Sequence, residues 1–383
     1  MGNKESITVL QVVPRLDAGG VERGVLEIAK ALHDAGYQSI VCSAGGAMVP
    51  ELEKLGTKHI VLPVDSKNPV EIFRNIKRLR RIIKQNDVNI IHARSRAPAW
   101  SSRFARLLTK CKFITTFHGT YGAKWWIKRL YNKSMLKSEK VIAISPFIFE
   151  HIRDTYSHNM QNVVVINRGV DLEEFAPEKM SKTRIKAAAG HLEIGAKTNK
   201  MVKFLLPARF TRWKGHAYLL EILRAMRNRN YVCYMVGLYT PDHDKYMRQI
   251  HELIKSYGLE DRVIIKQHYR DMPALYSVVD VVLSTSQEPE AFGRTIVEAQ
   301  SMSKITVATE HGGAMYTIEH GNNGYFIPVA DPMAAAAILD QILELDEAVA
   351  EEIKRNALRS VEMSYSTARM CDKTLKLYKQ VTR

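Results

Sequence analysis

Short apolar runs alternate with amphipathic stretches along most of the chain. The run at residues 7–13 is followed by residues 21–35, where apolar side chains recur every three or four positions. A short apolar run is typical of a buried strand in a parallel sheet, and the second spacing is typical of a helix with one buried face. The first half repeats this order, with further strands expected at residues 38–43, 59–63, 89–92, 113–117, 141–144 and 163–166 and a helix at residues 71–85.

The alternation stops after residue 176 and starts again near residue 201. The intervening stretch contains Pro177, several lysines and Gly190, and it has at most a short helix near residues 182–189. The second series has strands at residues 203–207, 231–236, 263–266, 279–283 and 305–308, with helices at residues 216–228, 243–257, 272–277 and 294–302.

This order predicts an α/β protein built from two doubly wound parallel-sheet domains, each Rossmann-like. We expect the domains at residues 1–176 and 201–365, with residues 177–200 as the connection between them. Residues 366–383 form a final amphipathic helix, whose expected buried face is Ala368, Cys371, Leu375 and Tyr378. The carboxyl ends of the strands of both domains are expected to line a cleft.

Length and composition support this organisation. A chain of 383 residues is long enough for two hydrophobic cores, and 46% of its residues are hydrophobic. No apolar run reaches the length of a membrane-spanning helix, and the polar start lacks the apolar core of a signal peptide. The four cysteines are far apart and form no metal-type pair, which favours a reducing cytosol.

The net charge of +16 is concentrated in residues 67–140, which begin at Lys67 and end at Lys140. This basic segment holds 19 basic and three acidic residues, and the remaining 37 basic and 37 acidic residues cancel. Such a surface attracts anionic lipid headgroups or nucleic acid, and a solvated surface without a partner is the other interpretation. We expect Trp125 and Trp126, next to Lys124, to lie at the level of lipid headgroups.

Two glutamates, Glu290 and Glu298, flank a predicted turn between a buried strand and a helix. Gly293 lies in this turn, where backbone N–H groups and the positive end of the helix dipole would face an anion, most often a phosphate. One carboxylate would accept a sugar hydroxyl and the other a ribose hydroxyl. On spacing alone, two solvated acidic residues are an equally acceptable interpretation.

Four more loops follow predicted strands, and ligands of doubly wound sheets bind at such loops. Gly19 and Gly20 allow the backbone to approach a phosphate or a sugar closely. His118 is placed to donate to a hydroxyl or a phosphate oxygen. Arg209 and Lys214 would together offset the charge of a leaving diphosphate.

The fourth of these loops carries Arg270 and Met272, placed to hold a nucleobase by backbone contacts. Each of the four also has a plain structural interpretation as a tight turn, a structural histidine or a polar connection. No suitable loop carries an Asp-x-Asp pair for a metal on the diphosphate, because Asp242 and Asp244 are interpreted as the start of a helix. We therefore expect the basic pair to replace a metal.

Together these motifs resemble the retaining glycosyltransferases of family 4, which have the GT-B fold. The resemblance covers nearly the whole chain and depends on the order of the pieces, since any one of them alone is unspecific. The matching pieces are Gly19-Gly20, His118-Gly119, residues 209–215, Arg270-Asp271-Met272 with Asp280, and Glu290-Ala291-Phe292-Gly293 with Glu298, the family's E-x7-E motif. Residues 92–100 are similar to bacterial sugar transferases of lipopolysaccharide core assembly.

The chain departs from the family at two positions. Gln267 lies where the family often has glycine, and Gly312-Gly313 is followed by Ala314-Met315-Tyr316 where the family often has x-Pro-Glu. Neither departure removes a proposed catalytic group, and both leave the identity of the donor open.

The resemblance implies a role for each site residue. Glu298 would bind the ribose and Glu290 the transferred sugar, while Arg209 and Lys214 would hold the diphosphate. His118 would contact the donor sugar near the reacting carbon. Backbone N–H groups to sugar and phosphate would come from Ala291, Phe292, Gly293 and Thr295. No metal and no cofactor beyond the nucleotide-sugar substrate is implied, and the C-terminal helix would cross back to the first domain.

The sequence thus predicts a cytoplasmic, metal-independent hexosyltransferase at the inner face of a membrane. It would move a hexose from a nucleotide diphosphate sugar to a saccharide or lipid-linked acceptor, in the assembly of lipopolysaccharide or another envelope glycan. Two alternatives stay open. A GT-B epimerase or hydrolase would use the same donor loops. A nucleic-acid-binding protein would use the basic segment, with Trp100, Trp125 and Trp126 stacked on bases, although no recognised binding module appears.

Overall fold

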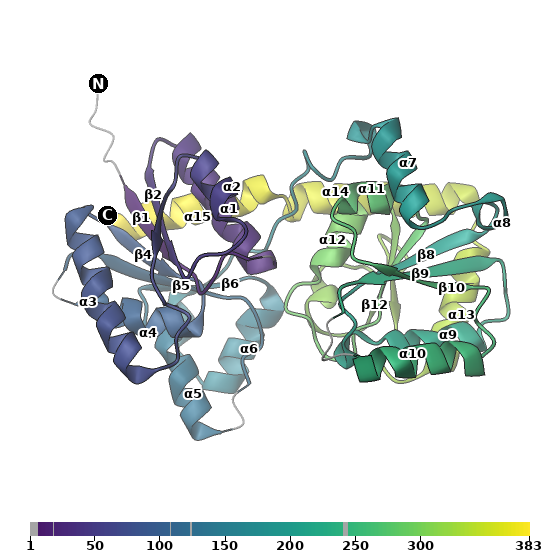
Figure 1. Cartoon of the computed structure of the whole chain (residues 1–383), viewed down its shortest axis with the longest axis horizontal. Helices are drawn as coiled ribbons and strands as arrows, with labels where there is room; N and C mark the ends of the chain where they lie inside the picture. The colour runs from purple at the N-terminus through teal and green to yellow at the C-terminus, as the bar shows by residue number, and fades with distance from the viewer. Residues whose placement is uncertain (1–6, 18, 108, 123–124, 240–243) are drawn as a thin grey trace. The chain divides into compact units, whose positions relative to one another are not determined.

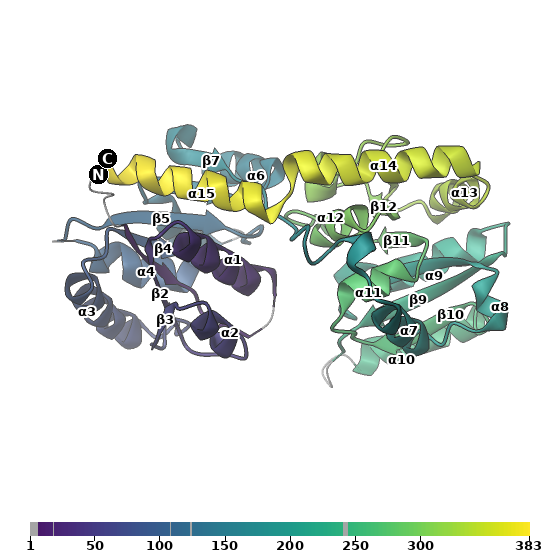
Figure 2. The same ribbon diagram turned by 90° about the horizontal axis from the view of Figure 1, so that it is seen from above.

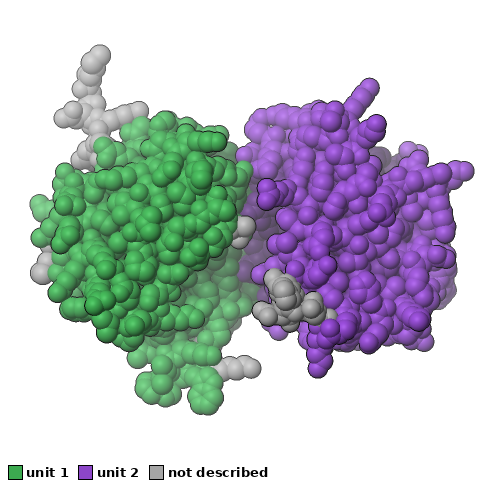
Figure 3. Space-filling view, in the orientation of Figure 1, with its two compact units in different colours: residues 1–169, 367–383 green, residues 170–366 purple. Residues whose placement is uncertain are grey.

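Two compact units make up the protein, coloured separately in Figure 3. Unit 1 comprises Met1–Gly169 and Thr367–Arg383, and unit 2 comprises Val170–Ser366. The structure is a computed structural model that describes residues 7–17, 19–107, 109–122, 125–239 and 244–383. The stretch 177–200, expected as a connection, belongs to unit 2 and carries η3 (Pro177–Lys179), α7 (Lys182–His191) and α8 (Ala196–Asn199).

Unit 1 is built on a seven-stranded sheet of parallel strands in the order β3-β2-β1-β4-β5-β6-β7. The strands are β1 (Thr8–Val12), β2 (Gln38–Ser43), β3 (Lys58–Val61), β4 (Ile90–Ala93), β5 (Lys112–Phe117), β6 (Lys140–Ala143) and β7 (Val163–Val165). The chain starts in the middle of the sheet, runs to one edge and returns at β4. The switch point of this topology, where a crevice for ligands is expected, therefore lies between β1 and β4.

Unit 2 repeats the same plan with six parallel strands in the order β10-β9-β8-β11-β12-β13. They are β8 (Val202–Pro207), β9 (Tyr231–Gly237), β10 (Val263–Gln267), β11 (Val281–Ser284), β12 (Ile305–Thr309) and β13 (Tyr325–Ile327). The edge strand β13 was not among the predicted strands. The switch point here lies between β8 and β11.

Helices cover both faces of each sheet, which confirms the doubly wound α/β class (Figures 1 and 2). In unit 1 they are α1 (Gly20–Asp34), α2 (Val49–Lys54), α3 (Pro69–Gln85), α4 (Arg96–Ala105), α5 (Trp126–Asn132), η1 (Lys133–Leu136), α6 (Pro146–Tyr156), η2 (Met160–Asn162) and α15 (Thr367–Thr382). In unit 2 they include η4 (Arg212–Lys214), α9 (His216–Ala225), α10 (Asp244–Ser256), α11 (Met272–Ser277), α12 (Arg294–Ser301), η6 (Gly312–Tyr316), α13 (Pro332–Leu343) and α14 (Glu347–Ser364).

The hydrophobic pattern explains these elements. Strand β1 is buried along its whole length, as expected for a central parallel strand. Helix α1 buries Val25, Ile28 and Leu32 on one face, at the predicted three- and four-residue spacing. The predicted helix start at Asp242 lies outside the described residues, and α10 begins at Asp244.

The C-terminal helix α15 packs on unit 1 beside α1 (Figures 1 and 2), so the predicted return to the first domain is confirmed. Tyr378 is buried and its hydroxyl lies 2.6 Å from Nδ1 of His92 on β4. The predicted buried face was partly wrong, because Ala368 is exposed and Leu375 only half-buried. The residues that the helix buries are Met370, Cys371, Thr374, Leu377 and Tyr378.

Within the described ranges, none of the helices combines the length and the apolar character that crossing a membrane requires.

Candidate active site

Two loops of unit 2 meet at the switch point between β8 and β11. The loop after β8 contains Lys214 and Gly215, and the loop after β11 contains Thr285. The Thr285 hydroxyl donates to the carbonyl oxygens of Lys214 and Gly215, each at 3.2 Å. Gly215 has a φ of 74°, and a Cβ atom there would lie 1.8 Å from the Thr285 carbonyl oxygen. A glycine is therefore required for the two loops to come this close.

This approach brings Lys214 and Glu290 together. The Lys214 ammonium lies 2.8 Å from Oε1 of Glu290, and the hydroxyls of Ser284 and Ser286 donate to the same oxygen. Burial opposes ionisation of Glu290, but the lysine charge and the two hydroxyls outweigh it and lower the pKa of the carboxyl. The carboxylate is therefore ionised and held in one orientation at neutral pH.

A pair of glycines supports the backbone around Glu290. The N–H of Gly313 donates to the Glu290 carbonyl at 2.7 Å. A Cβ atom on Gly312 would lie 2.7 Å from that carbonyl oxygen, and one on Gly313 would lie 2.5 Å from Cα of Phe292. The departure from the family pattern begins after these glycines, at Ala314, so it leaves this close backbone contact intact.

Helix α12 begins directly after this loop. Its N-cap, Gly293, has a φ of 83°, the left-handed conformation that glycine adopts without strain. The first N–H groups of a helix have no partner in the preceding turn, and they carry the positive end of the dipole. The structure thus places the predicted backbone donors, from Ala291 to Thr295, at a helix N-terminus beside the carboxylate of Glu290.

Glu298 lies in α12, one turn further on, and is buried. Its Oε1 accepts from Nε of Arg294 at 2.5 Å, and its Oε2 accepts from the hydroxyl of Tyr276 at 3.1 Å. Burial raises the pKa of this carboxyl, and Arg294 partly offsets that effect. Each carboxylate oxygen can accept more than one hydrogen bond, so both remain available to a ribose hydroxyl.

Sequence reasoning missed Arg294 and Tyr276. The four-residue spacing of Arg294 and Glu298 on one helix is a signal that would have found the first. Tyr276 is on α11, 22 positions away from Glu298, and no local pattern marks that contact.

The other residues predicted to bind the donor in unit 2 have fewer side-chain contacts than Glu290 and Glu298. The side chains of Arg209 and Arg270 are exposed, and no ion pair of either is recorded among the described residues. Met272 is the first residue of α11, whose N-cap Asp271 accepts from the Ala274 N–H at 3.2 Å. Arg209 and Arg270 lie in the loops after β8 and β10, as predicted, and Met272 begins the helix that follows the second loop. None of the three has a hydrogen bond or ion pair to Glu290 among the described residues.

Unit 1 has a pocket of about 300 Å³ at its own switch point. His118 and Gly119, which follow β5, line this pocket together with the first turn of α1, whose N-cap is Gly19 and whose first residue is Gly20. Burial lowers the pKa of His118 well below its usual value, and the charges of Arg94 and Arg168 lower it further. The imidazole is therefore neutral at pH 7, with one N–H to donate.

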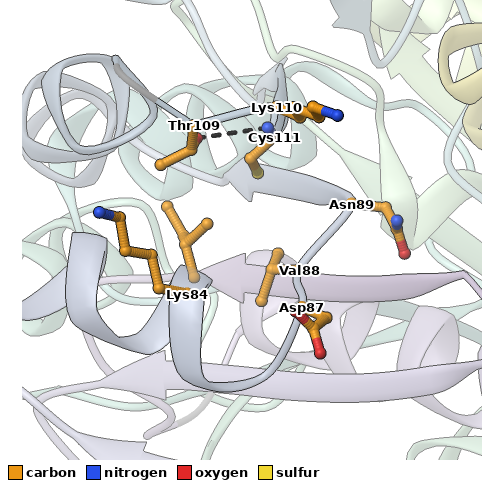
Figure 4. A pocket seen from close by; sticks show the side chains of 8 residues that line it. Lys84, Asp87, Val88, Asn89, Thr109, Lys110 and Cys111 are labelled. Atoms are coloured by element: carbon orange, nitrogen blue, oxygen red, sulfur yellow. Dashed lines mark hydrogen bonds between the residues drawn. The ribbon is translucent and has the colours of Figure 1, made fainter.

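A larger pocket of unit 1, about 630 Å³, lies at the opposite end of the sheet (Figure 4). It is bordered by Asp87, Val88 and Asn89, which precede β4, and by Lys110 and Cys111, which precede β5. Ligands of doubly wound sheets bind at the carboxyl ends of the strands. This pocket is therefore not the candidate site, although it is the larger of the two.

Comparison with known proteins agrees with this geometry. Residues 18–174 match the family model described as Glycosyltransferase Family 4, and residues 191–359 match the one described as Glycosyl transferases group 1. A glycosyltransferase from Rickettsia africae is 38% identical, with 99% of each chain covered and a TM-score of 0.91.

Two less similar structures share the fold. HepE of Anabaena, solved in complex with UDP-glucose, is 21% identical over 98% of this chain and all of that chain, with a TM-score of 0.83. WaaG, a glycosyltransferase involved in lipopolysaccharide biosynthesis, is 14% identical over 97% of this chain and 99% of that chain, with a TM-score of 0.74.

Among the described residues, no group of three or more His, Cys, Asp or Glu side chains is arranged to hold a metal ion.

Proposed function

The chain belongs to the glycosyltransferases of the GT-B fold, and from that premise we propose that it is a retaining hexosyltransferase of cell-envelope glycan assembly. The donor is a nucleotide diphosphate sugar, and the acceptor is a saccharide or a lipid-linked saccharide, as in lipopolysaccharide synthesis. The observation that carries the proposal is the Lys214–Glu290 pair, held beside the N-terminus of α12. It supplies a cation for the diphosphate and a carboxylate for the sugar within one hydrogen bond of each other.

In the proposed reaction, the bond between the anomeric carbon and the diphosphate oxygen breaks, and its electron pair stays on the diphosphate. Lys214, Arg209 and the dipole of α12 stabilise that charge as it develops. The acceptor hydroxyl oxygen bonds to the anomeric carbon on the face the diphosphate leaves. Its proton passes to a donor phosphate oxygen, so no protein base is required.

The other residues bind and orient the donor. Glu290 accepts from a hydroxyl of the transferred hexose, and Glu298 accepts from the ribose. The backbone at Arg270 and Met272 contacts the base. His118, which is neutral, donates to the donor sugar, as the family resemblance implies.

Product analysis tests this proposal directly. The protein is incubated with a panel of nucleotide diphosphate sugars and envelope glycan acceptors, with and without EDTA. We expect an acceptor-dependent glycoside with the anomeric configuration of the donor, at a rate that EDTA does not change. Donor consumption without a glycoside would instead identify the epimerase or hydrolase. Activity lost in EDTA and restored by Mg²⁺ or Mn²⁺ would show that a metal carries the role given to Lys214 and Arg209.

We also propose that unit 1 lies on an anionic membrane at the inner face of the cell envelope, through the basic segment. Four large apolar side chains on and next to α5 are more than half exposed: Trp125 (68%), Trp126 (73%), Ile127 (61%) and Leu130 (56%). Lys128 and Lys133, both exposed, lie in the same stretch. Apolar side chains mixed with cations suit the headgroup region, where each basic residue contributes about 1 kcal/mol.

Vesicle co-sedimentation over a salt series tests the membrane surface. We expect binding to vesicles with anionic lipid, little binding to neutral ones, and weakening as salt screens the charges. The variant Trp125→Ser/Trp126→Ser should bind several-fold more weakly, whereas Met333→Ser, an equally exposed apolar site in unit 2, should not. Equal binding to neutral and anionic vesicles, or none to either, would reject the proposal.

One of the three aromatic residues that a nucleic-acid-binding protein would stack on bases is packed against other side chains. Trp100 packs between Phe104 and Tyr131 at ring-centroid distances of 6.0 Å, and its indole N–H donates to the Tyr131 carbonyl. It therefore has a structural role and is not presented to a base. RNA added to the vesicle assay tests this alternative, because RNA displaces the protein from lipid only if RNA also binds the basic segment.

A further inference from the structure

Arg94 is a buried cation without an ion-pair partner among the described residues. It follows β4, is 4% exposed, and lines the unit 1 pocket. Its Nε and Nη2 donate to the Gln11 side-chain oxygen at 3.1 and 2.5 Å, and Nη2 also reaches the Gly24 carbonyl at 3.3 Å. These acceptors are neutral. Burial lowers the pKa of Arg94, the charge of the Glu27 carboxylate offsets this only in part, and a bound anion would offset it further.

A second buried arginine increases the positive potential of this region. Arg168 is 5% exposed and packs against the first turns of α1, where it donates to the Gly20 carbonyl at 2.6 Å. Its recorded carboxylate neighbour is Glu27, at 3.5 Å. Gly24 makes room for Arg168, because a Cβ atom there would lie 1.9 Å from its Nη1. The charge of Arg168 acts in the pocket, because together with Arg94 it adds to the effect of burial that lowers the pKa of His118.

Hydrogen-bond donors are among the groups that line the pocket. Besides Arg94 it is lined by Ser95 and by His118, whose Nε2 is buried and has no recorded hydrogen-bond partner in the described structure. Its volume of about 300 Å³ is at the small end of ligand pockets. One acidic residue, Glu22, also lines it, with its carboxylate turned back toward Gly19.

We propose that this pocket binds an acidic sugar of the acceptor, with its phosphate or carboxylate group on Arg94 and a hydroxyl on Glu22. Charge-assisted bonds to a guanidinium are the stronger kind of hydrogen bond. Nε and Nη2 of Arg94 already donate to Gln11 and Gly24, so the anion would accept from Nη1. The inference rests on the proposed function, because it names the class of acceptor. A neutral hexose would make no bond between two charged groups at Arg94 and would therefore bind more weakly.

Isothermal titration of the whole protein at fixed ionic strength tests this site. The probes are glucose, glucose 6-phosphate, glucuronate and UDP. We expect glucose 6-phosphate or glucuronate to bind at least tenfold more tightly than glucose, and to bind equally well when UDP is saturating. Equal binding of glucose and both acids would overturn the inference. Displacement of the acids by UDP would also overturn it, because the anion would then belong to the donor.

Variants separate this site from the donor site. Arg94→Gln should weaken binding of the acidic sugars at least tenfold while leaving UDP affinity unchanged, and unchanged UDP binding also reports a folded protein. Lys84→Gln, a cation at the other end of the same sheet, is the matched control and should change neither. If Arg94→Gln does not fold, Arg94→Lys keeps the charge but loses the planar guanidinium, and it should bind the acidic sugars several-fold more weakly than the wild type. If neither Arg94 variant changes the affinity for the acidic sugars, the proposed binding site is wrong. If the protein binds no nucleoside diphosphate at all, the proposed function is wrong instead.

Discussion

Replacing Lys214 with methionine is expected to lower kcat a hundredfold or more, with a smaller effect on donor affinity. The ammonium is 2.8 Å from Glu290, and our proposal assigns it to the charge that appears on the leaving diphosphate. A single donor aimed at a developing negative charge is typically worth a factor of about 10² to 10³ in kcat. Arg209→Ala is expected to act in the same direction, since it removes the other cation that we assign to the diphosphate.

The lysine also neutralises Glu290, so its removal has a stability effect that must be separated from catalysis. Without Lys214, Glu290 keeps its burial but loses the charge that lowers its pKa, and about 1–3 kcal/mol of stability is at risk. In the wild type, a lowered pKa means that this stabilisation is present above the ordinary glutamate range and is lost as the pH falls through the folded value. In Lys214→Met that loss should occur at a less acidic pH, which thermal unfolding across pH 3 to 7 would show.

Two further variants complete the Lys214 experiment. Lys214→Met/Glu290→Gln should regain thermal stability but not turnover, because it removes the unpaired charge without restoring a cation. Arg212→Met is the matched control: Arg212 is two residues away, its guanidinium lies over the Tyr246 ring, and it should retain nearly full kcat. A Lys214→Met enzyme within a few-fold of wild-type kcat would refute the assignment of this lysine to the diphosphate.

The sequence allowed the positions of the site loops to be predicted, because each loop follows an apolar run that could only be a buried strand. It did not predict which side chains pair across loops. Lys214 and Glu290 are 76 positions apart, and their contact depends on the order β8-β11 in the sheet and on the left-handed turn at Gly215. Strand order is a property of the folded sheet, and no local periodicity records it.

The unit 1 pocket shows the same limit more strongly. Arg94 is one of 19 basic residues in the basic segment, where most cations are exposed, and no sequence pattern marked it as buried. Its burial comes from its place at the end of a central strand, beneath α1 and next to Gln11. A count of charges treats every cation alike, whereas the fold determines which cation is buried.

Replacing Glu298 with alanine is expected to weaken donor binding by about 10- to 150-fold, with the fold retained. A hydrogen bond from a ribose hydroxyl to a buried carboxylate is worth roughly 1.5–3 kcal/mol, and every 1.4 kcal/mol is a factor of ten. Glu290→Ala should instead reduce transfer while leaving nucleoside diphosphate affinity nearly unchanged, because Glu290 is assigned to the sugar. Circular dichroism and thermal unfolding would verify that both variants are folded.

The Glu298 assignment is specific to the ribose, so pyrophosphate is the decisive control ligand. Titration calorimetry should show that Glu298→Ala binds the preferred nucleoside diphosphate far more weakly but binds pyrophosphate as the wild type does. Tyr276→Phe, which removes the hydroxyl that donates to Oε2 and leaves the carboxylate in place, should lose only a few-fold. Because burial raises the pKa of Glu298, nucleotide affinity should also begin to fall at a less acidic pH than an ordinary glutamate would cause. Near-normal nucleotide affinity in Glu298→Ala, or an equal loss for pyrophosphate, would show that this carboxylate holds the donor loop in place and does not bind the ribose.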